Sequence, residues 1–565
     1  MENLYSRLAP ALIAIIELLL MGAAAVAIVR PRREKPGGSG SSSFQVVERS
    51  FGRLARRRAL AVLTVGVGAI GVRTLLIPIL GVPEPRWNDE FSYLLAADTF
   101  ANGRVTNPPH PMWVHFESFH INQQPTYMSK YSPAQGLVLA AGQLLGHPWI
   151  GQLLITGAMC SALCWMLQRW LPPRWALFGA ILAALRLAVL SYWINAYWSA
   201  SVVAFGGALV LGAWPRLRSH PSIRMSLILG FGLLVLANSR PYEGLAFAIP
   251  IAILMMAWLA GANRPSFGQS VRKVLLPTVA VLVLGALATG YYNYRNTGSP
   301  LFMPYEVNRI QYETARYFLW QKPLPEPIYH HAEMRDYYRW EEGEFEQTRT
   351  LRGYLLRALD KVAGWWRFYL GPLLTLPFLA MPWVLRDRRV RVPIVLCVAT
   401  AVAIAVETWM SPHYFAPAAG ALYILLVQGI RHLRQWRRRS GDLGLQITRA
   451  ILLVACAMIV LRVTAAASHT HIEPDWPRGN LERASMLRQL QRMPGMHLVL
   501  VRYGPHHDTD REWVWNDASI DASKVVWARD MGRESNVELI QYFRGRKVWF
   551  LEADHAKPQL QPYPE

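Results

Sequence analysis

The residues that could do chemistry begin with two adjacent acids, Asp89 and Glu90, which follow an apolar run over 59–80. Carboxylates beside hydrocarbon are costly unless they are solvated or used. Asp89 could take a proton from an acceptor hydroxyl as a general base, and either carboxylate could hold a divalent cation. A charge pair that faces water at the start of a helix explains the same residues, because acids favour that position. From the pair alone, both interpretations stay open.

The stretch that follows adds cationic and aromatic candidates. Lys130 and Tyr131 stand directly before an apolar segment over 134–146, where the Lys130 ammonium could reach a lipid phosphate. Snorkelling at a membrane surface is the alternative for this lysine. Three histidines in the same stretch are spaced five residues apart, which does not stack them on one helix face and favours loop packing over a metal site. These histidines are His110, His115 and His120.

Three short polar stretches between apolar runs carry further candidates. Arginine suits bidentate contact with phosphate, so Arg240 and Arg295 are candidates for an anion site. A turn stiffened by an Arg240–Glu243 pair is the alternative for the first of them. Tyr242 lies within the first stretch, and His413 lies in the third, over 407–414.

Two other charged features have a structural alternative. Arg186 lies within an apolar run over 175–191, and a buried arginine in a spanning helix is a functional candidate, although this one is near enough to the end to snorkel. The loop over 292–367 interleaves acids with aromatics, which favours a solvated helix lying at the membrane interface over catalysis. Its acids include Glu333, Asp336, Glu341, Glu342, Glu344 and Glu346.

The elements that must position these residues are membrane helices. Of 565 residues, 52% are hydrophobic and only 17% are charged, and the mean hydropathy is positive. A spanning helix needs roughly 20 apolar residues. We therefore predict an all-α polytopic membrane protein with about twelve transmembrane helices. The runs are 9–29, 59–80, 149–168, 175–191, 199–214, 225–237, 244–260, 274–291, 368–385, 392–407, 413–430 and 446–465.

The formal net charge of +22 does not indicate nucleic acid, because the basic residues form short clusters beside the apolar runs, as membrane orientation requires. Arg30, Arg32 and Arg33 follow the first run, so 9–29 is predicted as a helix with its N-terminus outside, with a signal peptide as the alternative. If 134–146 is re-entrant or interfacial, all the later basic loops fall inside. The loops 81–148 and 292–367 and the tail from 466 then fall outside.

Three parts follow along the chain. Residues 1–52 form an extra transmembrane helix and a basic linker that is flexible over 36–43, and 53–465 form the transmembrane core. Residues 466–565 are predicted to be a small extracytoplasmic α/β module. It would have helices over 480–492 and 535–543 and strands over 497–502, 524–528 and 547–552.

With an acidic pair after an early membrane helix and a long aromatic outer loop, the chain resembles the GT-C superfamily of membrane glycosyltransferases. It looks most like the branch of protein O-mannosyltransferases and lipid A aminoarabinose transferases, over roughly 55–430. The stretch Tyr-Asn-Tyr-Arg-Asn-Thr-Gly-Ser-Pro-Leu-Phe at 292–302 and the stretch Pro-His-Tyr-Phe-Ala-Pro at 412–417 carry the same likeness.

The resemblance implies a GT-C-like core that moves a sugar from a polyprenyl-phosphate donor, with inversion, to an acceptor on the outer face. Asp89 matches the family's acidic position and would be the general base or its close partner, while Glu90 would orient the acceptor or a metal. Family members differ in whether they need a divalent cation, so the metal requirement stays open. Membrane lipid and an extracytoplasmic glycan, lipid or protein acceptor are the expected partners. From charge, we expect Lys130, Arg240 and Arg295 to neutralise the leaving phosphate, with Tyr131, Tyr242, Glu243 and His413 as further substrate contacts.

The chain departs from this family pattern in its extra N-terminal helix, in its small C-terminal module, and in lacking an added β-rich domain. The acceptor therefore stays open. A transporter or flippase of lipid-linked or small substrates is the main alternative, but it would more often show inverted repeats and ionisable residues at midplane. An assembly protein, or a ligase or polymerase of lipid-linked polymers, would leave the early acidic pair unexplained.

Overall fold

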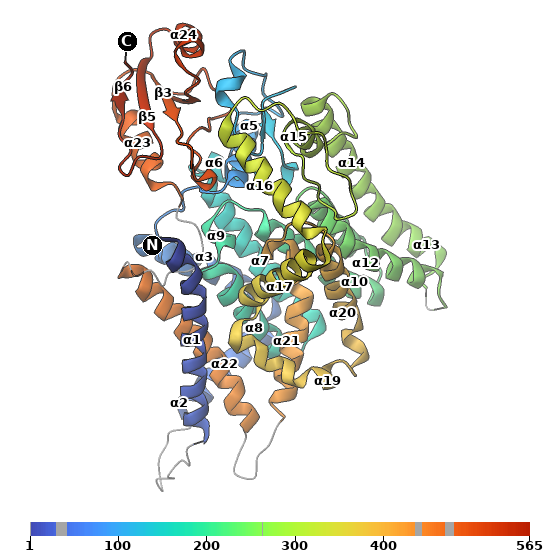
Figure 1. Ribbon diagram of the computed structural model, residues 1–565. Coiled ribbons are helices and arrows are strands. Elements are labelled where there is room, and N and C mark those ends of the chain that lie inside the picture. The colour runs from blue at the N-terminus through green and yellow to red at the C-terminus, as the bar shows by residue number, and fades with distance from the viewer. Residues whose placement is uncertain are drawn as a thin grey trace.

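The computed structural model describes residues 2–29, 42–262, 264–435, 443–468, 470 and 479–564. Most of them are helical, and helices far apart in the sequence pack side by side (Figure 1). Of the predicted linker over 36–43, only 42–43 are described, and they begin a helix. The basic clusters at 30–35 and 437–439 lie outside the described residues.

The predicted apolar runs all form helical structure. Within the described part of the chain, eight helices are long and apolar enough to cross a membrane, judged by length and composition. The runs at 175–191, 225–237, 368–385 and 392–407 form shorter or interrupted helices, so a total of about twelve spans stays a prediction. In 368–385 the interruption has a visible cause, because Pro372, Pro377 and Pro382 each remove a backbone donor.

The first half of the helical core lies within residues 2–260. Its elements are α1 (Glu2–Val29), α2 (Ser42–Arg56), α3 (Arg58–Leu75), α4 (Ile77–Leu80), α5 (Asn88–Ala101), α6 (Pro133–Leu144), α7 (Pro148–Trp170), α8 (Pro173–Ala183), the π-helical η2 (Ala184–Val189), α9 (Tyr192–Asn195), α10 (Ala200–Ser219), α11 (Ile223–Ala237) and α12 (Pro241–Ala260). The helix α7 packs against α3, α6, α8 and α10. The segment predicted to be re-entrant or interfacial is the short helix α6.

The second half completes the core and carries the second large loop. Its elements are α13 (Phe267–Gln269), the π-helical η3 (Ser270–Leu275), α14 (Leu276–Thr297), α15 (Pro304–Tyr312), α16 (Ala332–Thr348), α17 (Leu351–Tyr369), α18 (Gly371–Thr375), η4 (Leu376–Ala380), α19 (Met381–Val384), η5 (Arg388–Val390), α20 (Arg391–Ala405), η6 (Pro412–Ala418), α21 (Ala419–Leu433) and α22 (Leu443–Ala467).

Small residues bring the core helices close together. A Cβ added at Gly206 of α10 would lie 3.1 Å from the carbonyl oxygen of Gly232 in α11, and one added at Gly232 would lie 2.9 Å from the carbonyl oxygen of Gly206. In a membrane, the hydrophobic effect does not drive helices together, so close backbone packing at small residues stabilises their association instead. The pair therefore fixes the spacing of two central helices.

The C-terminal module has the predicted α/β form. The helices are α23 (Leu481–Arg492) and α24 (Arg533–Tyr542), and the strands are β3 (His497–Arg502), β4 (Val525–Arg529), β5 (Lys547–Glu552) and β6 (Gln561–Pro562), with η7 (Thr509–Arg511) between β3 and β4. The sheet order is β4-β3-β5-β6, with β3 parallel to both β4 and β5 and β6 antiparallel to β5. His497 sets the register opposite Val525 and Lys547.

Both faces of β3 are covered, which is why it is apolar throughout its centre. Val499 and Val501 pack under α23, whereas Leu498 and Leu500 share a core with Phe91 of α5 and other residues of the first large loop. Such near-continuous burial is typical of a central parallel strand. That loop also carries η1 (Trp113–Phe116), β1 (Ile121–Asn122) and β2 (Met128–Ser129). The module, α5, α15 and α16 therefore gather at one end of the molecule (Figure 1).

Candidate functional site

Asp89 lies in the first turn of α5, where the helix dipole favours a carboxylate. The Tyr131 hydroxyl donates a hydrogen bond to Asp89 Oδ1, and His120 Nδ1 lies 3.4 Å from the same oxygen. The Asp89 side chain remains 23% exposed. Its carboxylate is thus held on one oxygen and accessible, as a proton acceptor must be.

The surroundings of Asp89 keep it ionised. Burial alone would raise the pKa of the Asp89 carboxyl, but His120, the Tyr131 hydroxyl and the charge of Lys130 together hold it well below its ordinary value. Tyr131 is itself fixed by stacking on Tyr93, with 4.5 Å between ring centroids. Asp89, the best candidate for a general base, is therefore an anion at neutral pH.

Glu90, the second acid of the pair, is fully buried. Its Oε1 accepts the backbone N–H groups of Arg86 and Trp87 at 3.2 and 3.1 Å, and its Oε2 accepts that of Tyr197 at 2.9 Å. Burial raises the pKa of Glu90 to about 7 against the effect of these donors. This geometry suits a residue that positions the chain around Asp89 better than one that touches a substrate.

Lys130 forms a buried ion pair with a carboxylate that the sequence did not single out. Lys130 Nζ lies 2.6 Å from Glu313 Oε1, and Arg309 Nε of α15 lies 3.6 Å from Glu313 Oε2. All three side chains are at most 5% exposed. The Lys130 ammonium also lies over the Tyr305 ring, 5.0 Å from its centroid. The lysine charge is therefore already compensated.

The helix α16 reaches the same cluster. The Tyr337 hydroxyl lies 3.4 Å from His120 Nε2, on the side of the imidazole away from Asp89. Burial, and then the charge of Glu313, raises the pKa of Glu341 to about 8 while Lys130 opposes them. The expectation of a solvated acidic face is therefore wrong for Glu341, which is only partly exposed. The local sequence pattern did not predict this burial, because Glu313 and Lys130, whose charges act on Glu341, come from other parts of the chain.

Arg240 pairs with Glu243, as expected if this pair stiffens the turn. Arg240 Nε lies 2.5 Å from Glu243 Oε1, and the guanidinium lies over Tyr414 at 3.6 Å from the ring centroid. The Tyr242 hydroxyl donates to the Ala403 carbonyl at 3.2 Å. This group packs α12 against α20 and η6.

His413 and Arg295 have different surroundings. The Tyr192 hydroxyl lies 3.1 Å from His413 Nδ1, and the His413 ring packs on Trp198 with 4.5 Å between centroids. Arg295 is exposed in the last turn of α14, where it donates to the Tyr291 hydroxyl at 2.9 Å. Its described contacts are thus on its own helix.

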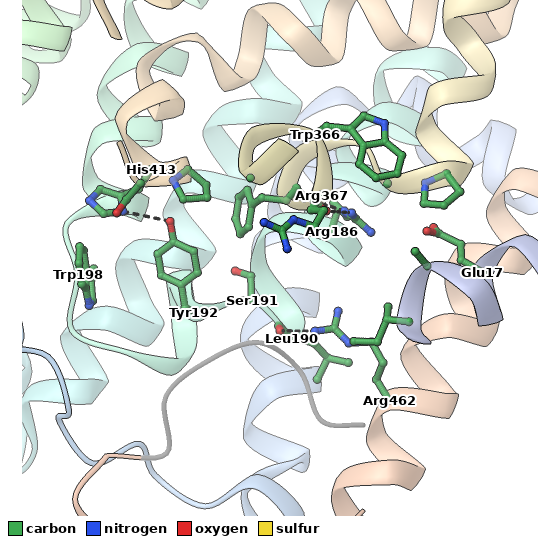
Figure 2. A pocket seen from close by; sticks show the side chains of 18 of the residues that line it. Glu17, Arg186, Leu190, Ser191, Tyr192, Trp198, Trp366, Arg367, His413 and Arg462 are labelled. Carbon is green, nitrogen blue, oxygen red and sulfur yellow. Dashed lines mark hydrogen bonds between the residues drawn. The ribbon is translucent and has the colours of Figure 1, made fainter. Parts of the chain in front are cut away.

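A cavity of about 540 Å³ adjoins this region on the side of α1. It reaches from Trp87, two residues before Asp89, past Tyr192 and His413 to α1 and α22, and Figure 2 shows Glu17, Arg186, Arg367 and Arg462 around one end of it. Sequence reasoning weighed Arg186 and missed the rest, because they lie on elements far apart in the chain. Among the described residues, the charged ones that line the cavity are Glu17, Arg86, Arg186, Arg367 and Arg462.

The C-terminal module docks directly on the loop that carries Asp89. Phe91 of α5 stacks on Trp515 with 5.1 Å between ring centroids, and Asn88 Nδ2 donates to the Thr509 carbonyl at 3.3 Å. Burial, the nearby Asp508 and the charge of Asp89 raise the pKa of Asp510 to about 6, against the charge of Arg86. The turn at η7 therefore lies within electrostatic range of the acidic pair.

The three histidines considered for a metal site serve packing and polar contacts. His110 Nε2 lies 2.9 Å from Asp521, and His115 Nδ1 lies 3.2 Å from the Arg529 carbonyl oxygen, while His120 is the partner of Asp89. Among the described residues, no group of three or more His, Cys, Asp or Glu side chains is placed to hold a metal ion.

The protein is therefore a multi-pass membrane protein with a helical core and a small α/β module docked on its first large loop. No family model matches the sequence, and no curated protein matches it. Three solved structures are similar over most of the chain. ArnT from Cupriavidus metallidurans bound to undecaprenyl phosphate is 13% identical, with a TM-score of 0.48, over 86% of this chain and 92% of that chain.

The other two structures are of the Archaeoglobus fulgidus oligosaccharyltransferase. AglB in complex with an inhibitory peptide and a dolichol-phosphate is 13% identical, with a TM-score of 0.47, over 78% of this chain and 59% of that chain. The complex with Zn and sulfate is 13% identical, with a TM-score of 0.48, over 87% of this chain and 68% of that chain. ArnT and AglB are GT-C superfamily members, the family that the sequence resembles.

Proposed function

We propose that this protein is an integral membrane glycosyltransferase that moves a sugar from a polyprenyl-phosphate donor to an acceptor hydroxyl on the extracytoplasmic face. The observation that carries the proposal is the Asp89 carboxylate, which is ionised, partly exposed and held by Tyr131 and His120 beside a cavity rich in arginine. The placement of this face outside rests on the distribution of basic loops.

The proposed reaction is a single displacement. The acceptor oxygen bonds to the anomeric carbon as the bond from that carbon to the phosphate oxygen breaks, which inverts the configuration and releases polyprenyl phosphate. The acceptor proton passes to Asp89, and His120 at 3.4 Å gives it an onward route. Because the pKa of Asp89 is low, we expect transfer of the proton only after the new bond has begun to form.

The residues expected to neutralise the leaving phosphate take modified roles in this proposal. Lys130 and Arg240 each lie against a carboxylate, Glu313 and Glu243, so they order the site more than they offer free charge. Tyr131 and His413 remain proposed substrate contacts. A divalent cation at Asp89 would need ligands from the substrate as well, because the described residues near it supply one carboxylate and one imidazole.

The test is turnover with a defined donor set. Protein in nanodiscs would be incubated with radiolabelled polyprenyl-phosphate sugars, and sugar lost from the lipid would be measured for wild type, Asp89→Asn and the control Asp336→Asn. Asp336 pairs with Arg335 and is 55% exposed on α16, so its replacement should change nothing. We expect transfer by wild type and by the control but not by Asp89→Asn. Movement of an intact donor across the bilayer without loss of sugar would instead favour a transporter or flippase.

A further inference from the structure

Three aromatic rings extend from Tyr131, whose hydroxyl binds Asp89, to the segment that follows α20. The Tyr305 ring lies 6.0 Å from that of Tyr131 between centroids, and Tyr317 stacks on Tyr305 at 4.9 Å. The Trp409 ring then meets Tyr317 edge-on at 5.9 Å. The rings of Tyr305, Tyr317 and Trp409, here called the aromatic wall, all belong to partly exposed residues. The wall therefore starts beside the proposed general base and can be reached from solvent.

Backbone pairing between distant segments holds the aromatic wall together. The Thr408 N–H donates to the Tyr317 carbonyl at 2.7 Å, and Phe318 forms an isolated antiparallel bridge with Glu407. The Thr408 hydroxyl also donates to the Arg316 carbonyl at 2.7 Å. Tyr317 and Thr408 are 91 residues apart in the sequence. Two loops thus pair like short strands and fix the side chains that they carry.

Three polar atoms beside the wall are buried and have no hydrogen-bond partner among the described residues. They are Arg309 Nη2, Glu407 Oε1 and Trp409 Nε1. Arg309 is 4% exposed, and its guanidinium carbon lies 3.6 Å from the Tyr317 ring centroid. Glu407 is 6% exposed. Buried polar groups without partners are costly and rare, so their concentration here points to a ligand that pairs with them.

The types of these atoms define the ligand. The nitrogens of Arg309 and Trp409 can only donate, whereas a carboxyl oxygen of Glu407 can accept. An anion would satisfy only the donors and a cation only the acceptor, but a hydroxyl group can pair with either. Burial, and then the charge of Glu243, raises the pKa of Glu407 against the effect of nearby cations, which favours its uncharged form. The matching ligand is uncharged and carries several hydroxyl groups.

The aromatic wall narrows this class further. A sugar ring has apolar C–H faces that pack on aromatic side chains, and it carries hydroxyl groups around its edge. Ligand sites generally combine aromatic lining with a few polar groups that fix orientation. In the proposed reaction the anomeric carbon must lie close to Asp89, and the wall begins there. The sugar of the donor is therefore the ligand that fits both the position and the chemistry.

We propose that Tyr305, Tyr317 and Trp409, together with Arg309 and Glu407, bind the sugar of the donor and select a neutral sugar over an amino sugar or a uronic acid. Arrival of this sugar on a polyprenyl phosphate rests on the proposed function. The preference for a neutral sugar rests on the unpartnered atoms alone.

Binding of lipids to the wild-type protein in nanodiscs tests the preference without any substitution. The probes are undecaprenyl phosphate alone and undecaprenyl phosphate carrying glucose, mannose, glucosamine or glucuronic acid. We expect a neutral sugar to tighten binding about tenfold over the bare lipid, the effect of about one hydrogen bond to a buried group, and the charged sugars not to tighten it. Binding of a charged sugar as tight as that of the neutral ones overturns the proposal, and so does no gain from any sugar.

Two substitutions then test the residues. Trp409→Phe keeps a ring and removes the N–H, and Glu407→Leu removes the carboxyl. We expect each to bind the neutral-sugar lipid about tenfold more weakly while binding the bare lipid as wild type does. Glu407→Gln, which keeps a donor and an acceptor, should retain the gain from the sugar. The control is Trp320→Phe, because Trp320 is 67% exposed.

Equal losses for both lipids would show a structural role and overturn the proposal, and so would wild-type binding of the neutral-sugar lipid by both Trp409→Phe and Glu407→Leu. No acceptor is present in these measurements, so transfer does not enter them. A gain from a neutral sugar that is lost in Trp409→Phe supports this site even if no acceptor is ever glycosylated and the proposed function fails. Transfer without any such gain leaves the proposed function standing and overturns this site.

Discussion

Lys130 and Glu313 are 183 residues apart in sequence and meet in a buried ion pair, with 2.6 Å between Nζ and Oε1. The pair ties the first large loop to the end of α15. Because Arg309 shares the same carboxylate, Glu313 compensates two buried cations. The relationship makes Glu313 the residue on which the order of this cluster depends.

We expect Glu313→Gln to destabilise the protein strongly. Removing one partner from a buried pair leaves uncompensated charge and costs about 3–5 kcal/mol. Thermal unfolding in detergent should show a large fall in Tm. The matched control is Glu326→Gln, whose carboxylate is 47% exposed and should matter little. Equal Tm values for both variants would contradict the role given to Glu313.

The raised pKa of Glu341 predicts a pH dependence of stability. Between its ordinary value of 4.5 and about 8, the folded protein keeps a proton on Glu341 that the unfolded chain has released. The free energy of unfolding therefore falls as the pH rises through this window. Glu341→Gln keeps the neutral form at every pH, so its Tm should fall less between about pH 5 and pH 8. The exposed Glu346→Gln on the same helix should follow wild type, and an identical slope for all three would refute the assignment.

Gly371 should tolerate no side chain. Its φ is +58°, and an added Cβ would meet Glu17 and Arg186 at 2.8 and 2.9 Å. The left-handed conformation alone costs a non-glycine residue about 1–2 kcal/mol. We expect Gly371→Ala to lower Tm and to loosen α1, measured by protease access to the N-terminal helix. Gly364 lines the same cavity with nothing within 4 Å of an added Cβ, and Gly364→Ala is the control.

Arg529 should govern the docking of the C-terminal module. It is 2% exposed, lies 2.6 Å from the fully buried Glu512 and donates to the Glu117 carbonyl of the first large loop at 2.8 Å. Arg529→Met leaves Glu512 buried without its cation, at a cost of about 3–5 kcal/mol. Hydrogen exchange should rise across both the module and the loop. Arg511→Gln, which alters an arginine that is 49% exposed and paired with the 44% exposed Glu482, should leave exchange unchanged.

The elements that depend on local pattern were predictable from the sequence. The alternation in 497–502 and 547–552 predicted β3 and β5 at those bounds, and each long apolar run predicted helical structure. Interruptions of a helix inside an apolar run were harder to predict. In 368–385, for example, three prolines divide one predicted helix into α18, η4 and α19. Periodicity reports burial, but it does not report where a proline ends a hydrogen-bonded turn.

The site was only partly predictable, because its partners come from distant segments. Asp89 stood out by its place after a membrane helix, and Tyr131 by its aromatic surroundings. Glu313 carried no local signal, since its role exists only where α15 meets Lys130. Glu17 was hidden inside an apolar run, although a lone acid in such a run is itself a signal that sequence reading can use.

The most direct test of the proposed chemistry is the rate of single-turnover sugar transfer from a polyprenyl-phosphate donor, compared between wild type and Asp89→Asn at equal amounts of folded, donor-bound protein. Loss of a general base should slow transfer by about 100-fold or more while donor binding persists. We predict that result, with one polyprenyl phosphate released for each sugar transferred. An Asp89→Asn rate close to that of wild type would contradict it.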